Sequence, residues 1–181
     1  LKSTRVVRTI KNIPKEQVKD YKVSVPEYYK EANKFFNDQK GTFRFISLPL
    51  RGEGISYNWE KPYIGVDLSY TFFDTPNISN NTTIPFFSDL VSSLSNYQLN
   101  PKLVNFFPFI NAKHLLLRDD LNYLRDHMAN PKILSSRLEQ MTKDGVLFKK
   151  ANFGDKLSIY EIAEKWFWPK IYVTAQIAVS N

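Results

Sequence analysis

One apolar run constrains the fold of this chain more than any other stretch: three consecutive leucines at residues 115–117. A short continuous apolar run with polar neighbours is typical of a strand buried on both faces, at the centre of a parallel or mixed sheet. Three charged residues, Arg118, Asp119 and Asp120, follow it immediately. Ligands of open α/β sheets usually bind beyond the carboxyl ends of the strands. The segment therefore predicts both the centre of a sheet and a polar cluster at the edge where a ligand would bind.

The rest of the chain predicts an α/β fold: a central mixed β-sheet flanked by helices, with a β-rich C-terminal part. Helices are indicated by apolar residues at helical spacing and by Asn-Pro or Thr-Ile-Pro start signals. In these signals the side-chain oxygen of Asn or Thr accepts a free N–H of the first turn, and proline has no N–H that needs a partner. Strands are indicated by alternation of apolar and polar residues. The expected helices cover residues 26–39 and begin near Thr83, Asn100 and Asn130; the expected strands are residues 42–48, 113–118, 145–149, 156–162 and 171–177.

The remaining segments are expected to be less regular. Residues 50–83 are interpreted as an irregular surface segment, with a ragged strand around residues 63–70, and residues 119–127 as one or two helical turns. Residues 1–25 are polar and are expected to form a linker or tail near a membrane. We therefore expect residues 26–181 to be a single α/β domain.

Composition supports one packed domain. The chain has 181 residues, of which 43% are hydrophobic and 15% aromatic, and this is ample for a core and argues against intrinsic disorder. No apolar run approaches the roughly 20 residues needed to cross a bilayer, and no signal peptide is recognisable. Because the sequence starts with Leu1-Lys-Ser-Thr, we expect it to be a piece of a longer protein.

The charge does not predict a nucleic-acid interface. The formal net charge is +7, but the basic residues are spread along the chain and are densest near the N-terminus, where they equally suit a tail beside a membrane. No Gly-aromatic or zinc motif accompanies them, so no nucleic-acid partner is expected. Cysteine is absent, which excludes disulfides, thiolate metal sites and cysteine nucleophiles but indicates no compartment.

No complete catalytic motif is present, and we assign no catalytic residue, metal site or cofactor. Phosphate-loop, dinucleotide and nucleophile-elbow signatures are missing, and the two histidines lack metal-ligand spacing. His114, within an apolar strand, is interpreted as a structural residue whose hydrogen bonds are satisfied, and not as a base. Asp119 and Asp120 have the chemistry to bind a cation or to act as acid and base. The favoured alternative is that at least one of them caps the following helix.

Five residues have side chains suited to a sugar. Aromatic rings stack on the C–H faces of a sugar, while carboxylates and guanidinium groups bond its hydroxyls. The alternative favoured for Tyr57 and Trp59 is that both rings cover a loop against the core, because large aromatics with a polar atom are often partly buried without a ligand. The candidate ligand-binding residues are Tyr57, Trp59, Asp67, Arg118 and Asp119.

Two more features concern the surface. Trp166, Phe167 and Trp168 precede Pro169 on a connection between expected strands, and three adjacent aromatics either cap the core or contact a partner. Residues 77–83 contain three overlapping Asn-X-Ser/Thr sequons, which we take only as a sign of an exposed loop.

Several motifs, in order over residues 26–174, resemble a known family. They are Pro26-Glu-Tyr-Tyr, Phe35-Phe36, Phe43-Arg-Phe-Ile-Ser-Leu-Pro, Tyr57-Asn-Trp, Tyr63-Ile-Gly-Val-Asp, Asn111-Ala-Lys-His-Leu-Leu-Leu-Arg-Asp-Asp-Leu-Asn-Tyr, Phe153-Gly-Asp-Lys-Leu-Ser-Ile-Tyr-Glu-Ile and Pro169-Lys-Ile-Tyr-Val-Thr. The pattern resembles the soluble region of very large multi-pass membrane glycosyltransferases, closest to the arabinofuranosyltransferase type of actinobacterial envelopes and related polytopic sugar-transfer proteins. The resemblance implies a soluble domain outside the cytoplasm, following transmembrane helices of a parent chain. Catalytic carboxylates of such proteins usually lie in loops between those helices, so none is carried over.

Three functions remain open at this point. The first is a domain of an envelope glycosyltransferase that helps to hold a glycan or a lipid-linked sugar, with the transmembrane part of its own parent chain as partner. The second is a structural or protein-interaction module at the cell surface, without sugar affinity, that uses Trp166, Phe167 and Trp168 as its contact patch. The third is a free-standing hydrolase that uses Asp119 or Asp120.

Overall fold

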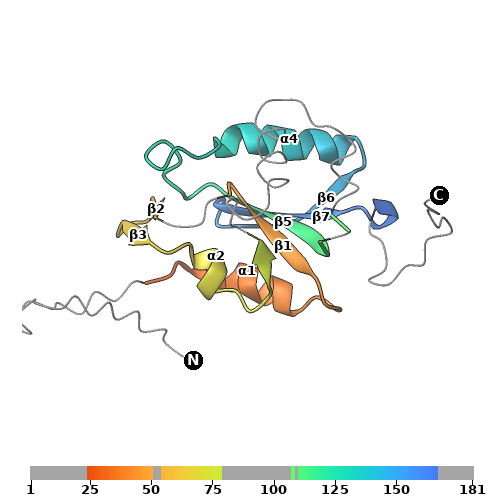
Figure 1. The fold of residues 1–181 in the computed structure, drawn as a ribbon, viewed down its shortest axis with the longest axis horizontal. Helices are drawn as coiled ribbons and strands as arrows, with labels where there is room; N and C mark the ends of the chain where they lie inside the picture. Colours follow the sequence, from red (N-terminus) through yellow and green to blue (C-terminus); the bar gives the residue numbers. More distant parts are fainter. Residues whose placement is uncertain (1–23, 51–53, 79–106, 109, 167–181) are drawn as a thin grey trace, which may run out of the picture.

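A computed structural model describes residues 24–50, 54–78, 107–108 and 110–166 of the chain (Figure 1). The helices are α1 (Glu27–Asn37), α2 (Leu68–Thr71), α4 (Pro131–Lys143) and the short 3₁₀-helix η3 (Glu164–Trp166); the strands are β1 (Arg44–Leu48), β2 (Ile55–Tyr57), β3 (Tyr63–Gly65), β4 (Asn77–Ile78), β5 (Ala112–Arg118), β6 (Leu147–Phe153) and β7 (Leu157–Ile162).

Five of the strands form one mixed sheet in the order β4-β1-β5-β7-β6, and β2 and β3 form a separate antiparallel pair. Strand β1 pairs in parallel with both β4 and β5, whereas β7 runs antiparallel to β5 and to β6. Strand β5 is the middle strand, as its leucine run predicts. The predicted α/β class with a central mixed sheet is confirmed.

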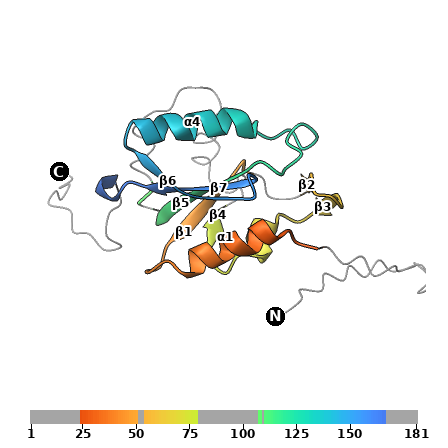
Figure 2. The ribbon, with the colours of Figure 1, turned by 180° about the vertical axis from the view of Figure 1, so that it is seen from behind.

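The helices lie on opposite faces of this sheet: α4 covers one face and α1 the other (Figures 1 and 2). The leucines of β5 alternate between the two sides, because successive side chains of a strand point to opposite faces. Leu115 and Leu117 join the core under α4, and Leu116 joins the core under α1. A strand between two cores has no polar face, which is why its apolar run is continuous.

A tight hairpin joins β6 and β7, which the sequence predicts as strands at residues 145–149 and 156–162 with a longer connection between them. The backbone N–H of Lys156 donates to the carbonyl of Phe153 at 3.0 Å, so the turn has two central residues, Gly154 and Asp155. Both have positive φ, 55° and 51°, which is the geometry of a type I′ turn. This turn matches the twist of the strands and carries β6 four residues beyond its expected end at residue 149.

Two predicted segments differ from the structure. Residues 119–121 form a bend and one isolated bridge, Leu121 to Tyr57, and the expected helical turns are reduced to a single turn, in which the Asp126 N–H donates to the Asn122 carbonyl at 3.1 Å. Residues 63–70 contain the short strand β3 and the helix α2, with Asp67 as the N-cap of α2, instead of one ragged strand. The helices expected near Thr83 and Asn100 and the strand at residues 171–177 lie outside the described residues. Among the described residues, no helix has the length and hydropathy to cross a bilayer.

The start signal of α4 gives a direct test of the capping argument. Asn130 adopts an extended conformation and its side-chain oxygen accepts the backbone N–H of Lys132 at 2.9 Å, with Pro131 following. Asn130→Ala is expected to lower the free energy of unfolding by about 1 kcal/mol, because this N–H loses its partner. Urea unfolding measures the change. The control Glu139→Ala, at an exposed position of α4, should change stability much less, and equal losses in the two variants would contradict the capping role.

Candidate functional site

A buried ion pair connects the end of β5 with the start of α2. Arg118 and Asp67 are both fully buried, and Nη1 of the arginine lies 2.5 Å from Oδ1 of the aspartate. The same carboxylate oxygen accepts the Tyr57 hydroxyl at 3.2 Å and the backbone N–H and hydroxyl of Ser69 at 2.8 and 2.7 Å. Nη2 of Arg118 donates to the carbonyl of Pro49 at 2.9 Å. Burial lowers the pKa of the guanidinium, but the Asp67 carboxylate together with Tyr57 and Tyr29 raises it by more, and the net shift of the pKa is upward.

A second buried carboxyl, Asp120, lies next in the sequence. Its Oδ2 accepts the Trp59 indole N–H at 2.8 Å and the Tyr28 hydroxyl at 2.9 Å, and its Oδ1 accepts the Tyr29 hydroxyl at 3.2 Å. Burial raises the pKa of Asp120, although the Trp59 and Tyr28 hydrogen bonds oppose the rise. Asp120 therefore ties α1 and the segment after β2 to the end of β5. The prediction that one of the two aspartates caps a following helix is wrong for Asp120, because turns follow it and its side chain accepts these three donors instead.

Four of the five predicted ligand-binding residues thus lie inside the molecule. Tyr57 is 1% exposed and Trp59 9%, and their ring centroids lie 4.7 Å apart. Together with the ion pair of Asp67 and Arg118, they hold the β2–β3 pair against the sheet. A ligand would have to displace this packing in order to stack on either ring, so their contact with a sugar stays a prediction. Sequence reasoning missed the partners of Asp120 on α1, since nothing local in the sequence marks a hydrogen bond between residues 28 and 120.

Asp119, the fifth of these residues, is exposed and lines a groove of about 230 Å³. The groove lies at the carboxyl end of β5, between the first turns of α4 and the turn of the β6–β7 hairpin. The backbone N–H of Asp119 donates to the carbonyl of Lys156 at 2.8 Å, and this bond fixes the edge of the groove. The residues that line it are Leu117, Asp119, Pro131, Lys132, Ser135, Lys149, Asn152, Asp155, Lys156 and Ser158.

The lining of this groove is polar and carries more positive than negative side chains. Three lysines line it, and none of them has a carboxylate within salt-bridge distance in the part of the chain that the structure describes. Asn152 donates to Asp155 at 2.8 Å and accepts the Ser158 hydroxyl at 3.1 Å, so these side chains are held in place. The sequence signals for this side of the groove are the Gly154-Asp155 turn and the Asn130-Pro131 helix start. They lie on different elements, and only the fold brings them together.

The other predicted site residues are only partly covered. Trp166 ends η3, and Phe167 and Trp168 lie outside the described residues, so the partner contact at these three aromatics stays a prediction. His114 is fully buried among the rings of Phe36 and Phe43 at centroid distances of 5.6 and 4.9 Å, but the prediction of satisfied hydrogen bonds is wrong, because neither ring nitrogen has a partner among the described residues. Across residues 24–50, 54–78, 107–108 and 110–166, no group of three acidic or histidine side chains is placed to hold a metal ion.

Comparison with solved structures gives one fold relationship. The cryo-electron microscopy structure of arabinofuranosyltransferase AftD from mycobacteria matches with a TM-score of 0.56 and 18% sequence identity over 77% of this chain. This chain is similar in fold to part of AftD. Two structural classes of an AftD mutant match as well, with TM-scores of 0.62 and 0.57 and identities of 18% and 16%, over 77% and 80% of this chain. No family model and no curated protein matches the sequence.

The matched part of AftD is small. This chain covers 12% of the AftD chain in one structure and 13% in each of the other two. At this level of identity the similarity establishes the fold alone. The resemblance expected from the sequence motifs therefore agrees with the structural comparison for one domain. Most of the AftD chain lies outside the matched part.

Proposed function

We propose that this chain is an extracytoplasmic accessory domain of a larger membrane protein, a glycosyltransferase of cell-envelope glycan assembly, and that it binds a glycan or a lipid-linked sugar. The observation that carries the proposal is the fold similarity to a small part of AftD, an arabinofuranosyltransferase, over most of the present chain. Because this chain corresponds to only about an eighth of such an enzyme, its role in this proposal is to bind or position the sugar for the rest of the enzyme. Its partner in this proposal is the transmembrane part of its own parent chain.

The groove at Asp119 is the site that we assign to the sugar. It lies at the carboxyl end of a central strand that is parallel to its neighbour β1, where ligands of α/β sheets usually bind. The Asp119 carboxylate accepts hydroxyl donors, and Asn152 and Ser158 supply further polar atoms at fixed positions. Lys132 and Lys156 suit an anionic group such as the phosphate of a lipid-linked sugar. The buried cluster around Arg118 supports this edge from inside, and it is not assigned a ligand contact.

Binding is tested by amide chemical shifts. The ¹⁵N-labelled chain is titrated with a synthetic arabinofuranosyl tetrasaccharide and with arabinofuranosyl phosphate, and the shifts of Asp119, Asn152 and Ser158 are followed. Asp119→Ala is expected to weaken binding by about tenfold or more, because a hydrogen bond to a charged group is lost. Lys156→Ala should weaken the phosphate more than the tetrasaccharide.

The control for this experiment is Asp144→Ala, which removes an exposed carboxylate at the opposite end of α4. It should leave both affinities unchanged. If neither sugar shifts any groove residue, the assignment of this groove is wrong. The second function, a structural or protein-interaction module without sugar affinity, would then be favoured by the burial of four of the five predicted ligand-binding side chains.

A further inference from the structure

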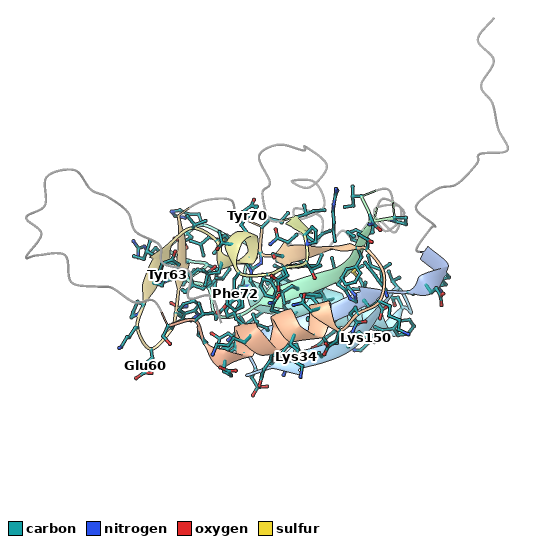
Figure 3. The ribbon with its side chains drawn as sticks, turned by 90° about the horizontal axis from the view of Figure 1, so that it is seen from below. Lys34, Glu60, Tyr63, Tyr70, Phe72 and Lys150 are labelled. Carbon is teal, nitrogen blue, oxygen red and sulfur yellow. The ribbon has the colours of Figure 1, made fainter. Side chains whose placement is uncertain are left out.

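A second surface, on the α1 side of the sheet, has aromatic side chains that are half-buried or exposed. Figure 3 views this side and labels Lys34 on α1 and Lys150 on β6. Strand β6 lies at the edge of the sheet, and Phe148 on this strand is 51% exposed. Phe35 of α1 and Phe153 at the end of β6 are half-buried. Scattered exposed apolar residues need no explanation, but these three rings lie along one boundary between α1 and β6.

A shallow, open cavity of about 450 Å³ lies between α1 and the end of β6. It is lined by Glu31, Lys34, Phe35, Asp38 and Phe153. The first four belong to one face of α1, because side chains three, four and seven residues apart lie above one another on a helix. The two phenylalanine rings meet edge to face, with their centroids 6.1 Å apart. The cavity thus has an aromatic floor with two carboxylates and one ammonium group around it.

One end of the cavity is fixed by the β6–β7 turn. Gly154 lies against Tyr28 of α1, and a Cβ atom at this glycine would come within 3.0 Å of the Tyr28 ring. Its φ of 55° also favours glycine. The close approach of the turn holds Phe153 beside α1, so the floor of the cavity is part of the rigid fold.

Phe148 extends the same surface along β6. It pairs with Glu161 of β7, and Phe153 pairs with Leu157. Residues 157 and 161 are four apart on one strand, so the two phenylalanines face the same side at a separation of about 13 Å along the strand. The Lys150 ammonium lies 6.0 Å from the centre of the Phe148 ring and 2.6 Å from Glu161.

We propose that this surface, Phe35, Phe148 and Phe153 with the charged groups Glu31, Lys34, Asp38 and Lys150, binds a neutral oligosaccharide chain; we call it the aromatic face. Sugar rings present apolar C–H faces to aromatic side chains and hydroxyl groups to carboxylates. The spaced rings suit a ligand with a repeating apolar surface, longer than one sugar unit. Glu161 pairs with both Lys150 and Lys113, so three carboxylates and three ammonium groups balance each other here, and the aromatic face has no net charge that would select a strongly charged polymer.

The aromatic face shares no residue with the groove at Asp119, which lies on the α4 side. The inference rests on the proposed function only in taking a carbohydrate as the ligand class. The aromatic face would be a second binding surface, for an uncharged sugar chain, beside the groove at Asp119, whose lysines suit an anionic group. An apolar contact between two copies of this chain would bury the charged side chains around the rings. Their presence therefore distinguishes the aromatic face from such a contact.

The test uses ¹⁵N-labelled protein and three named probes: α-1,5-linked arabinotetraose, maltotetraose and cellotetraose. At least one is expected to shift the amides of Phe35, Phe148 and Phe153. Phe148→Ala, at an exposed position that the fold does not need, should weaken this binding by about three- to tenfold. The matched control is Leu124→Ala, which removes another large exposed apolar side chain, 73% exposed, from the segment after β5.

Each outcome separates the two binding surfaces. Shifts confined to the aromatic face that survive Asp119→Ala support the inference even where the groove binds nothing. Shifts confined to the groove overturn the inference and leave the proposed function standing. If sedimentation shows a dimer that Phe148→Ala dissociates, and no probe shifts these amides, the aromatic face is a contact between two copies and the inference is wrong.

Discussion

Asp67→Asn is expected to lower the free energy of unfolding by about 3–5 kcal/mol, because it leaves the Arg118 guanidinium buried without a counter-charge. Both side chains are fully buried. The variant keeps the size of the aspartate and the oxygen that accepts the hydrogen bonds of Arg118 and Ser69, so the loss comes from the charge. Urea unfolding, followed by tryptophan fluorescence, measures the change.

A second substitution in the same protein is the control. Asp67→Asn combined with Arg118→Met is expected to be more stable than Asp67→Asn alone, because an apolar side chain of similar length needs no counter-charge. The carbonyl of Pro49 then loses one donor, at a cost of about 1 kcal/mol. A double variant as unstable as the sum of the two single variants would show that the buried charge is not the cause.

Acid is expected to destabilise the domain through His114. Burial lowers the pKa of this imidazole to about 4 in the folded protein, against 6.5 for an ordinary histidine. The unfolded chain therefore binds more protons between these two values, and stability falls as the pH drops from about 6.5 to about 4. The shift corresponds to a loss of roughly 3 kcal/mol. The physical reason is that a charged imidazole would lie among phenylalanine rings, with no hydrogen-bond partner among the described residues.

The measurement is the free energy of unfolding at several pH values for the wild type and for His114→Phe. The substitution places an aromatic ring of similar size in an aromatic surrounding. The difference between the two proteins should change by roughly 3 kcal/mol across this pH range and stay constant above about pH 7.5. Carboxylates that titrate at lower pH affect both proteins equally. Parallel curves for the two proteins would mean that His114 is not the group responsible.

Local signals predicted the elements that depend on local chemistry. The leucine run identified β5 as the central strand, and Asn130-Pro131 identified the start of α4, with Leu134, Leu138 and Met141 in the core. Each of these features follows from side chains within a few residues. Of the helical turns expected at residues 119–127, only one forms, at residues 122–126. Before it, Leu121 pairs with the distant Tyr57 in an isolated bridge, which no local signal predicts.

The candidate site shows the same limit. Tyr57, Trp59 and Asp67 have the side chains of a sugar site, and the sequence cannot show that their polar atoms are already bonded: Tyr57 to Asp67, Trp59 to Asp120 and Asp67 to Arg118. The last two contacts join residues 61 and 51 positions apart, and the first joins short segments on either side of β3. Arg118 and Asp120, on either side of Asp119, are buried. Successive side chains alternate in direction at the end of the strand, so the side chain of Asp119 points outward to the groove.

The turn between β6 and β7 has a consequence for every mutational study of this domain. Its last residues, Asp155 and Lys156, belong to the groove on the α4 side, while Phe153 before it belongs to the aromatic face on the α1 side. Phe153 directly follows Asn152 of the groove and lies two positions before Asp155, although the two surfaces face in opposite directions. A substitution in the turn therefore reports on both surfaces together. Only positions remote from it, such as Lys132 for one surface and Phe148 for the other, give independent measurements.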